Sequence, residues 1–294
     1  MVQVVEDRVV QEDESLREAV LLYSREIAFS AADVYAKAAE ARGLWDARLE
    51  ALVVDSILSG ENEEELASRI AALGWRAGGA VVALIGVATE PVDQDSLRRI
   101  ARKNNADVLI GVHGNRLIVV IGRIEKTSAS DTPVISFLNI AEALDSHFGD
   151  GPIVLGPEVP GVALANRSAK AALAGYSVVK SWLKAPRPIY ADDLLAERSL
   201  AGDMLAKQTL IDRIYLPLAK NSPELRETLS AYLESGRSLE STARELFVHP
   251  NTVRYRLKKI SEIIGWDATG SREAFVLQVA MVLGSMSDTE NRKK

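Results

Sequence analysis

The stretch SLESTARELFVHPNTVRYRLKKISEII, residues 238–264, predicts two short helices joined by a tight turn. Ser238 is a favourable N-cap for the first helix, and Glu240 adds negative charge to its first turn, where the helix dipole favours it. Only residues 248–250 separate the two helices. Two short helices joined in this way are typical of a helix-turn-helix motif.

The second helix, residues 251–264, has two chemically different sides. At about 100° per residue, its apolar residues form one stripe that we expect to be buried, namely Val253, Leu257, Ile260 and Ile264. The opposite side carries cations, an amide, a hydroxyl and an aromatic ring, which are groups that bind phosphates and read base edges in a major groove. Arg256 lies nearer the edge of the stripe, where its stem can pack and its head can reach outward. We therefore predict DNA contacts by His249, Asn251, Thr252, Arg254, Tyr255, Arg256, Lys258 and Lys259.

The charge of this region differs from that of the whole chain. Six basic and two acidic side chains lie between Arg237 and Ile260, a local balance of +4, whereas the 294-residue chain has a formal charge of −6. Screening limits exposed charges to a reach of about 8–10 Å, so the acidic total does not cancel a local basic patch. The tight turn and the capping pattern favour DNA binding over the alternative, a solvated basic face on an ordinary helical bundle. For His249, in the turn, two roles stay open: a cap for the second helix or a contact with a phosphate.

Residues 192–294 are predicted to form a C-terminal helical domain, with the helix-turn-helix at about 238–264. The expected helices cover residues 192–200, 203–215, 222–236, 238–247, 251–264 and 272–283, and the polar tail is expected to fray. Residues 1–75 are predicted to form an N-terminal helical segment, with helices at residues 13–42, 45–60 and 61–74.

The first of these helices carries an apolar stripe that repeats close to every 3.5 residues, as a coiled-coil seam does. It consists of Leu16, Val20, Tyr23, Ile27, Val34 and Ala38. Ser30 occupies a position where such a seam needs a large apolar residue. Two interpretations stay open: an amphipathic helix packed on its own domain, or a helix that dimerises.

Residues 76–191 are predicted to form an α+β domain. Its clearest signal is residues 106–122, where two apolar runs flank His113-Gly114-Asn115-Arg116, a pattern that predicts a hairpin turn. The other expected elements are a strand at 78–89, a helix at 95–105, a loop at 125–133, a helix at 137–148, a strand at 152–156, a helix at 163–183 and a strand near Ile189. This order predicts a mostly antiparallel sheet covered by helices on one side.

The sequence LFVHPNTVRYRLKKISEIIG, residues 246–265, strongly resembles the C-terminal helix-turn-helix of PucR-type, CdaR-like bacterial transcription regulators. Residues 227–247 also look like that family, and residues 153–173 resemble the end of its GGDEF-like domain. The Val-His-x-Asn-Thr-x-x-Tyr-Arg run of the family is met at Val248, His249, Asn251, Thr252, Tyr255 and Arg256.

Residues 23–58 and 191–203 are similar to one subgroup, the actinobacterial activators of fatty-acid and mycolic-acid synthase genes. The resemblance implies binding to double-stranded promoter DNA of a fatty-acid synthase operon and a response to long-chain acyl-CoA. It also implies a longer N-terminal region than this chain has, so a sensing or dimerisation region is expected to be shortened here. An acyl ligand would need an apolar cleft, which the first helices and residues 163–183 are candidates to line. Its charged groups would meet arginines, for which the candidates are Arg42, Arg48 and Arg167.

The middle domain lacks the residues that catalysis would need. GGDEF domains hold metal and substrate with acidic residues on a hairpin, and the corresponding hairpin here has no carboxylate in residues 113–116. The strand at 78–89 has none before Glu90 either, so Mg²⁺ and a triphosphate have few oxygen ligands. The three histidines have no metal-binding spacing. We expect no enzyme activity, neither cyclase nor phosphodiesterase, and neither a cofactor nor a metal site.

Composition sets the remaining limits. The chain has no cysteine, which excludes disulfides and thiolate sites, and no apolar run reaches the ~18 residues of a membrane span. Its acidic N-terminus lacks the features of a secretory signal, so a cytoplasmic protein is expected. We predict a DNA-binding transcription regulator that acts as a homodimer or higher oligomer. The alternative is a metabolite-binding or protein-interaction adaptor that does not bind DNA directly.

Overall fold

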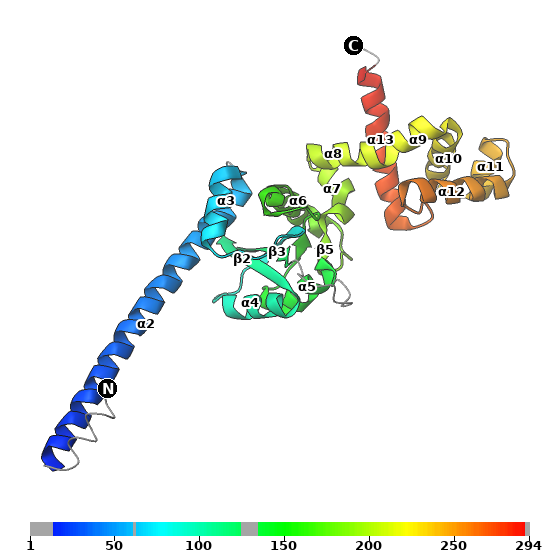
Figure 1. Ribbon diagram of the computed structural model, residues 1–294. Coiled ribbons are helices and arrows are strands. Elements are labelled where there is room, and N and C mark those ends of the chain that lie inside the picture. Colours follow the sequence, from blue (N-terminus) through cyan, green and yellow to red (C-terminus); the bar gives the residue numbers. More distant parts are fainter. Residues whose placement is uncertain (1–13, 61–62, 125–134, 292–294) are drawn as a thin grey trace, which may run out of the picture.

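The computed structural model describes residues 14–60, 63–124 and 135–291. Over these residues the chain has an α+β fold, with two N-terminal helices, a domain built on a five-stranded sheet, and a C-terminal group of helices (Figure 1). This confirms the predicted fold class. The predicted loop at residues 125–133 lies outside the described residues.

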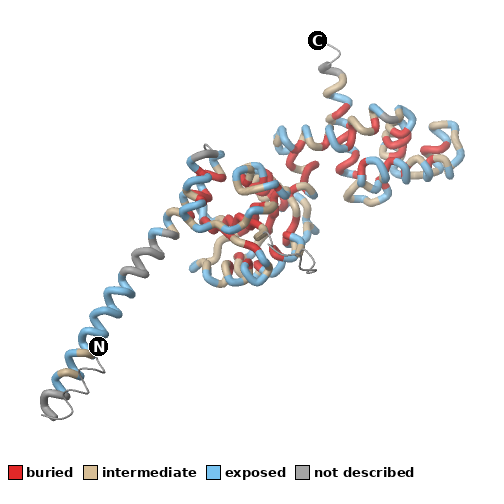
Figure 2. The backbone as a smooth tube through the Cα atoms, viewed as in Figure 1, coloured by how far each residue is buried: buried red, intermediate tan, exposed pale blue. Residues whose placement is uncertain are grey.

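The first helix, α2 (Glu14–Ser59), is continuous over 46 residues, and α3 (Glu63–Ala72) follows it. The sequence predicted two helices with a break near Gly43, and that prediction is wrong. A single glycine within a helix costs only about 1 kcal/mol relative to alanine, and no proline interrupts this segment. The buried side chains that are described on α2 all lie between Glu50 and Ile57, so only its C-terminal end packs on the domain (Figure 2).

The sheet has the strand order β2-β3-β1-β4-β5. Its strands are β1 (Val81–Val87), β2 (Ala106–His113), β3 (Arg116–Arg123), β4 (Val154–Leu155) and β5 (Ile189–Tyr190). All neighbouring strands are antiparallel except β4 and β5, which confirms the mostly antiparallel sheet. The predicted hairpin is also confirmed, because His113 pairs with Arg116 and only Gly114, with a φ of 61°, and Asn115 lie between them.

Helices cover both faces of this sheet, so the prediction of helices on one side is wrong. One face packs against α4 (Gln94–Lys103) and α5 (Phe137–Leu144), and the other packs against α2, α3 and α6 (Ala165–Val178). Successive residues of β1 belong to different cores, Leu84 to the first and Ile85 to the second. A strand that is buried on both sides needs a continuous apolar run instead of an alternating one, which is what residues 81–87 provide.

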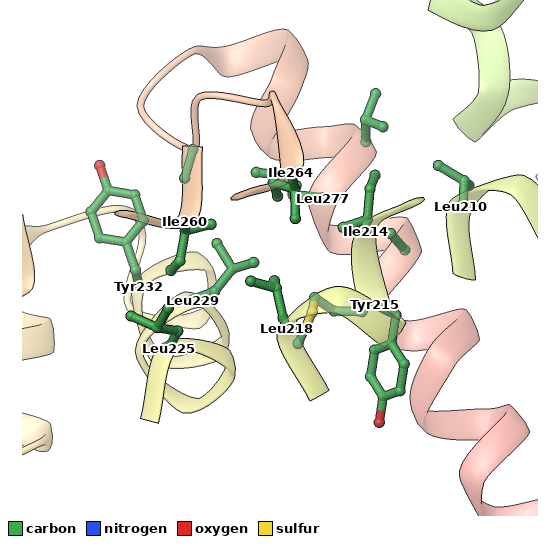
Figure 3. Close-up of a cluster of buried hydrophobic side chains, with 14 of the residues drawn as sticks. Leu210, Ile214, Tyr215, Leu218, Leu225, Leu229, Tyr232, Ile260, Ile264 and Leu277 are labelled. Carbon is green, nitrogen blue, oxygen red and sulfur yellow. The ribbon is translucent and has the colours of Figure 1, made fainter. Parts of the chain in front are cut away.

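The C-terminal helices share one hydrophobic core (Figure 3). Leu218, Leu229, Ile260 and Leu277 meet there from four different helices. The helices are α7 (Leu195–Leu200), α8 (Met204–Leu210), α9 (Leu216–Asn221), α10 (Pro223–Glu234), α11 (Leu239–Glu245), α12 (Pro250–Ile264) and α13 (Ser271–Asn291). A π-helical turn at Ile211–Tyr215 links α8 to α9, so the helix that was predicted to end near Tyr215 continues to Asn221.

Two arginines lie where the middle and C-terminal parts meet. Arg198 is 2% exposed, and its Nε donates a hydrogen bond to Asp203 at 3.0 Å. Arg272, at the start of α13, forms an ion pair with Glu197 on α7. Its guanidinium carbon also lies 4.1 Å from the centroid of the Trp182 ring. Arg272 therefore connects α13 both to α7, through Glu197, and to the end of the middle domain, through Trp182.

Candidate DNA-binding interface

The turn between α11 and α12 is capped by His249. Its Nδ1 accepts a hydrogen bond from the backbone N–H of Asn251 at 3.2 Å, and Pro250 occupies the first helical position. Of the two roles left open for His249, the cap is therefore observed. A neutral imidazole that accepts at Nδ1 carries its hydrogen on Nε2, and the ring is exposed, so the same side chain still has a donor for a phosphate.

The apolar stripe of α12 is buried as predicted. Val253 and Ile260 are fully buried, and Leu257 and Ile264 are each 6% exposed. All four belong to the C-terminal core, together with Leu229 of α10. Gly265, with a φ of 79°, ends the helix in a left-handed conformation that glycine adopts at little cost. The stripe therefore fixes which side of α12 faces outward.

The opposite side of α12 is open. Asn251, Arg254, Tyr255, Lys258 and Lys259 are exposed, and Tyr255 retains 66% of its accessible surface. Thr252 is half-buried. Arg254 donates a hydrogen bond from Nη1 to Oδ1 of Asn251 at 2.7 Å, so these two side chains form a linked pair at the start of the helix. Lys258 lies 4.0 Å from a Glu262 oxygen, a distance at the outer limit of an ion pair.

Arg256 is placed differently from the other predicted contacts. Its side chain is 19% exposed, and its guanidinium group points to α10. Nη2 donates to Glu224 at 2.9 Å and Nη1 donates to the Thr228 hydroxyl at 3.1 Å. Because its charge is already paired, we interpret Arg256 as a residue that positions α12, and a direct DNA contact by it stays a prediction.

The residue that sequence reasoning missed is Phe247. It was assigned to the end of the preceding helix, but α11 ends at Glu245 and Phe247 lies in the turn. Its side chain is 96% exposed and its φ is 54°, a left-handed conformation that is uncommon for residues other than glycine. A fully exposed phenyl ring in strained backbone, in the turn that leads into α12, is a candidate for binding. The only signal in the sequence was an aromatic residue next to the three-residue connection.

The hairpin of the middle domain carries a histidine and an arginine that contact neighbouring helices. His113 Nδ1 lies 3.4 Å from an Asp55 oxygen of α2, and the Arg116 guanidinium lies 5.2 Å from the centroid of the Tyr176 ring. Within the described residues, no three His, Asp or Glu side chains come together in a way that would hold a metal ion. None of the described helices has the length and apolar character needed to cross a membrane.

Comparison with known proteins gives matches for both the middle and the C-terminal parts. Residues 225–283 match the PucR C-terminal helix-turn-helix domain, and residues 59–178 match a GGDEF-like domain. The crystal structure of a regulator of polyketide synthase expression from Bifidobacterium adolescentis is 32% identical, with a TM-score of 0.69 over 82% of this chain and 93% of that one. The carbohydrate diacid regulator of Escherichia coli is 35% identical over 85 residues, 29% of this chain and 22% of that protein.

A Mycobacterium tuberculosis protein named Uncharacterized protein Rv2242 is 42% identical over 285 residues, which are 93% of this chain. The chain spans 66% of the length of that mycobacterial relative. A buried stripe opposite a cationic face on the second helix of the motif defines a protein of the helix-turn-helix class. The chain belongs to the PucR family, which is a family of transcription regulators and not of enzymes.

Proposed function

We propose that this chain binds double-stranded promoter DNA in a sequence-specific way and regulates transcription in the bacterial cytoplasm, as a homodimer or higher oligomer. The observation that carries the proposal is the exposed side of α12, where Arg254, Lys258 and Lys259 lie opposite a buried apolar stripe. A helix with this arrangement can enter a major groove without disturbing the core that holds it.

The DNA contacts that we propose for α12 are of two kinds, contacts with phosphates and contacts with base edges. Lys258 and Lys259 present ammonium groups that suit phosphates, which set affinity without reading sequence. Asn251 and Arg254 lie at the N-terminal end of α12, where helix-turn-helix proteins contact base edges. Their mutual hydrogen bond holds an amide and a guanidinium group side by side, and these groups make bidentate contacts with adenine and guanine, respectively.

Phe247 extends this surface with an apolar group. It lies two residues before the cap of α12, and it is almost fully exposed in the described structure. Apolar side chains recognise the methyl group of thymine in the major groove. We assign Phe247 this role.

A gel-shift titration over a range of salt concentrations tests the proposal. Specific binding with a steep negative dependence on salt is expected, because each phosphate neutralised contributes a slope of about −0.9. Lys259→Ala should weaken binding to specific and random DNA alike, whereas Arg254→Ala should also relax sequence preference. No binding at low salt would contradict the proposal and favour the protein-interaction adaptor.

We further propose that the target genes belong to fatty-acid synthesis and that the effector is a long-chain acyl-CoA, as the resemblance to the actinobacterial activators implies. A cleft of about 660 Å³ between α2, α3, α6 and the hairpin supports a ligand with an apolar chain and a charged head. Leu58, Ile118 and Leu173 line it, as do Arg69 and Arg116. Of the arginines predicted from the sequence, Arg48 and Arg167 are exposed and do not line this cleft, and the Arg42 side chain lies outside the described residues.

The effector proposal has its own test. Palmitoyl-CoA should change the DNA affinity of the wild-type chain, and Arg116→Ala should reduce that change while leaving DNA binding without effector intact. Lys170→Ala is a matched control, because Lys170 is an exposed cation of α6 that does not line this cleft. An equal response of the Arg116 variant and the wild type would contradict this site.

A further inference from the structure

The N-terminal two thirds of α2 project away from the sheet domain, and no other described element lies beside them (Figure 1). The described side chains that precede Glu50 on this helix are all exposed or half-buried (Figure 2). At about 1.5 Å per residue the whole helix is about 70 Å long, which exceeds the diameter of a small domain. A helix in a protein gains most of its stability from packing, and the described part of the subunit provides no packing for this projecting length.

The projecting part exposes a regular apolar stripe. Tyr23, Ile27 and Val34 are 67%, 51% and 65% exposed. Val20 precedes Ile27 by seven residues, as Ile27 precedes Val34. Positions 20, 27 and 34 repeat every seven residues. Tyr23 and Ser30 fall between them as the second set of a heptad, in which Tyr23 is apolar and Ser30 is the one polar interruption. The interpretation of α2 as a helix packed along its own domain does not hold for this stripe.

The residues beside the stripe indicate what covers it. On one flank lie the acids Glu26 and Asp33, and on the other lie the small uncharged residues Ser24 and Ala31. In a parallel pair each acidic flank faces the uncharged flank of the other helix, whereas an antiparallel pair would bring acidic flanks together. The β-branched residues at positions 20, 27 and 34 are of the type found at one of the two core positions of parallel two-stranded coiled coils.

We propose that α2 forms a parallel homodimer seam in which Val20, Ile27 and Val34 pack against the same residues of a second copy. A parallel seam places both sheet domains at the same end of the pair, and with them both copies of α12. This inference supplies the dimer that the proposed DNA-binding function requires, and in that respect it rests on that function. Leu22 and Phe29, which are also exposed, lie on another side of α2 and provide controls.

Cross-linking tests the orientation, because the chain has no cysteine of its own. Val20→Cys and Val34→Cys should each give a disulfide-linked dimer under mild oxidation, while Ala32→Cys, on the far side of the helix, should not. Positions 20 and 34 lie about 21 Å apart along the axis, so an antiparallel pair cannot join both to themselves. Cross-linking of only one of the two variants, or of none, overturns the parallel seam.

Sedimentation equilibrium tests the seam without cross-links. Ile27→Asp should raise the dimer dissociation constant at least tenfold, and Phe29→Asp should leave it near the wild-type value. Equal effects of the two variants overturn the proposal. A wild-type chain that cross-links at positions 20 and 34 but binds no DNA supports the seam and contradicts the proposed function. A chain that binds specific DNA as a dimer but does not cross-link at positions 20 and 34 contradicts the seam and supports the proposed function.

Discussion

Arg256 of α12 and Glu224 of α10 form an ion pair at 2.9 Å that joins the candidate reading helix to the helix behind it. Thr228 of the same α10 accepts a second hydrogen bond from Arg256 at 3.1 Å. The guanidinium group therefore crosses from one helix to the other. If this pair sets the angle at which α12 is presented, Glu224 contributes to DNA binding without touching DNA.

We expect Glu224→Ala and Arg256→Ala to weaken specific DNA binding by similar factors, about three- to tenfold, and the double variant to be no worse than either. The salt slope should stay unchanged, because no phosphate contact is lost. Glu227→Ala, which removes another exposed acid of α10, is the control. If Arg256→Ala reduced the slope by about 0.9 while Glu224→Ala had no effect, Arg256 would be a phosphate contact instead.

Phe247 should make DNA binding sensitive to thymine methyl groups. Replacing one thymine of the binding site with deoxyuracil removes a single methyl, and burial of such a group stabilises by about 0.8 kcal/mol, or roughly fourfold in affinity. At one position of the site the wild-type chain should show this loss, and Phe247→Ala should not. Phe247→Leu should retain part of it. Equal sensitivity of the wild-type chain and the alanine variant at every thymine would rule out this contact.

Glu50 should be required for the anchoring of α2. It is 2% exposed, pairs with Arg98 of α4, and accepts the backbone N–H of Ile110 at 2.8 Å. Glu50→Ala leaves that N–H without its partner and should destabilise the domain by about 2 kcal/mol. Glu50→Gln keeps an acceptor and should cost less. Hydrogen exchange of the β2 amides measures both effects, and unchanged protection of Ile110 in the alanine variant would contradict them.

The C-terminal group should lose stability at alkaline pH through Tyr215. Burial raises the pKa of Tyr215, and its hydrogen bond to Asp288 raises the pKa further. A raised pKa means that the neutral phenol stabilises the folded state fully below the unfolded pKa of about 10, and that this contribution is lost as pH rises through the folded value. Tyr215→Phe should therefore show a shallower decline in the free energy of unfolding above about pH 10. If the free energy of unfolding declined equally with pH in the wild-type chain and in Tyr215→Phe, the assignment to Tyr215 would be wrong.

Local sequence patterns were sufficient to predict those features of the structure that depend on residues close together in the chain. The hairpin at Gly114 and Asn115 follows from two apolar runs around a turn pair, and the buried stripe through Leu257 follows from helical spacing. The turn before α12 was predicted within a residue or two, because proline and a capping side chain mark it.

The sequence was not sufficient to predict contacts between residues that are far apart in the chain. Arg256 was grouped with the exposed cations because its partner Glu224 lies 32 residues earlier and meets it only when α10 and α12 pack. The cover on the second face of the sheet comes from α2, α3 and α6, and α6 begins far from β1 in the chain, at Ala165. The continuity of α2 was missed because one glycine was given more weight than its cost justifies.

The backbone of Phe247 has a consequence for how this turn tolerates change. A left-handed conformation costs a residue with a side chain about 1–2 kcal/mol, and glycine adopts it freely. Glycine at this position would make the C-terminal group more heat-resistant while removing the phenyl ring. At this position, thermal stability therefore favours glycine, whereas the DNA contact that we propose favours phenylalanine.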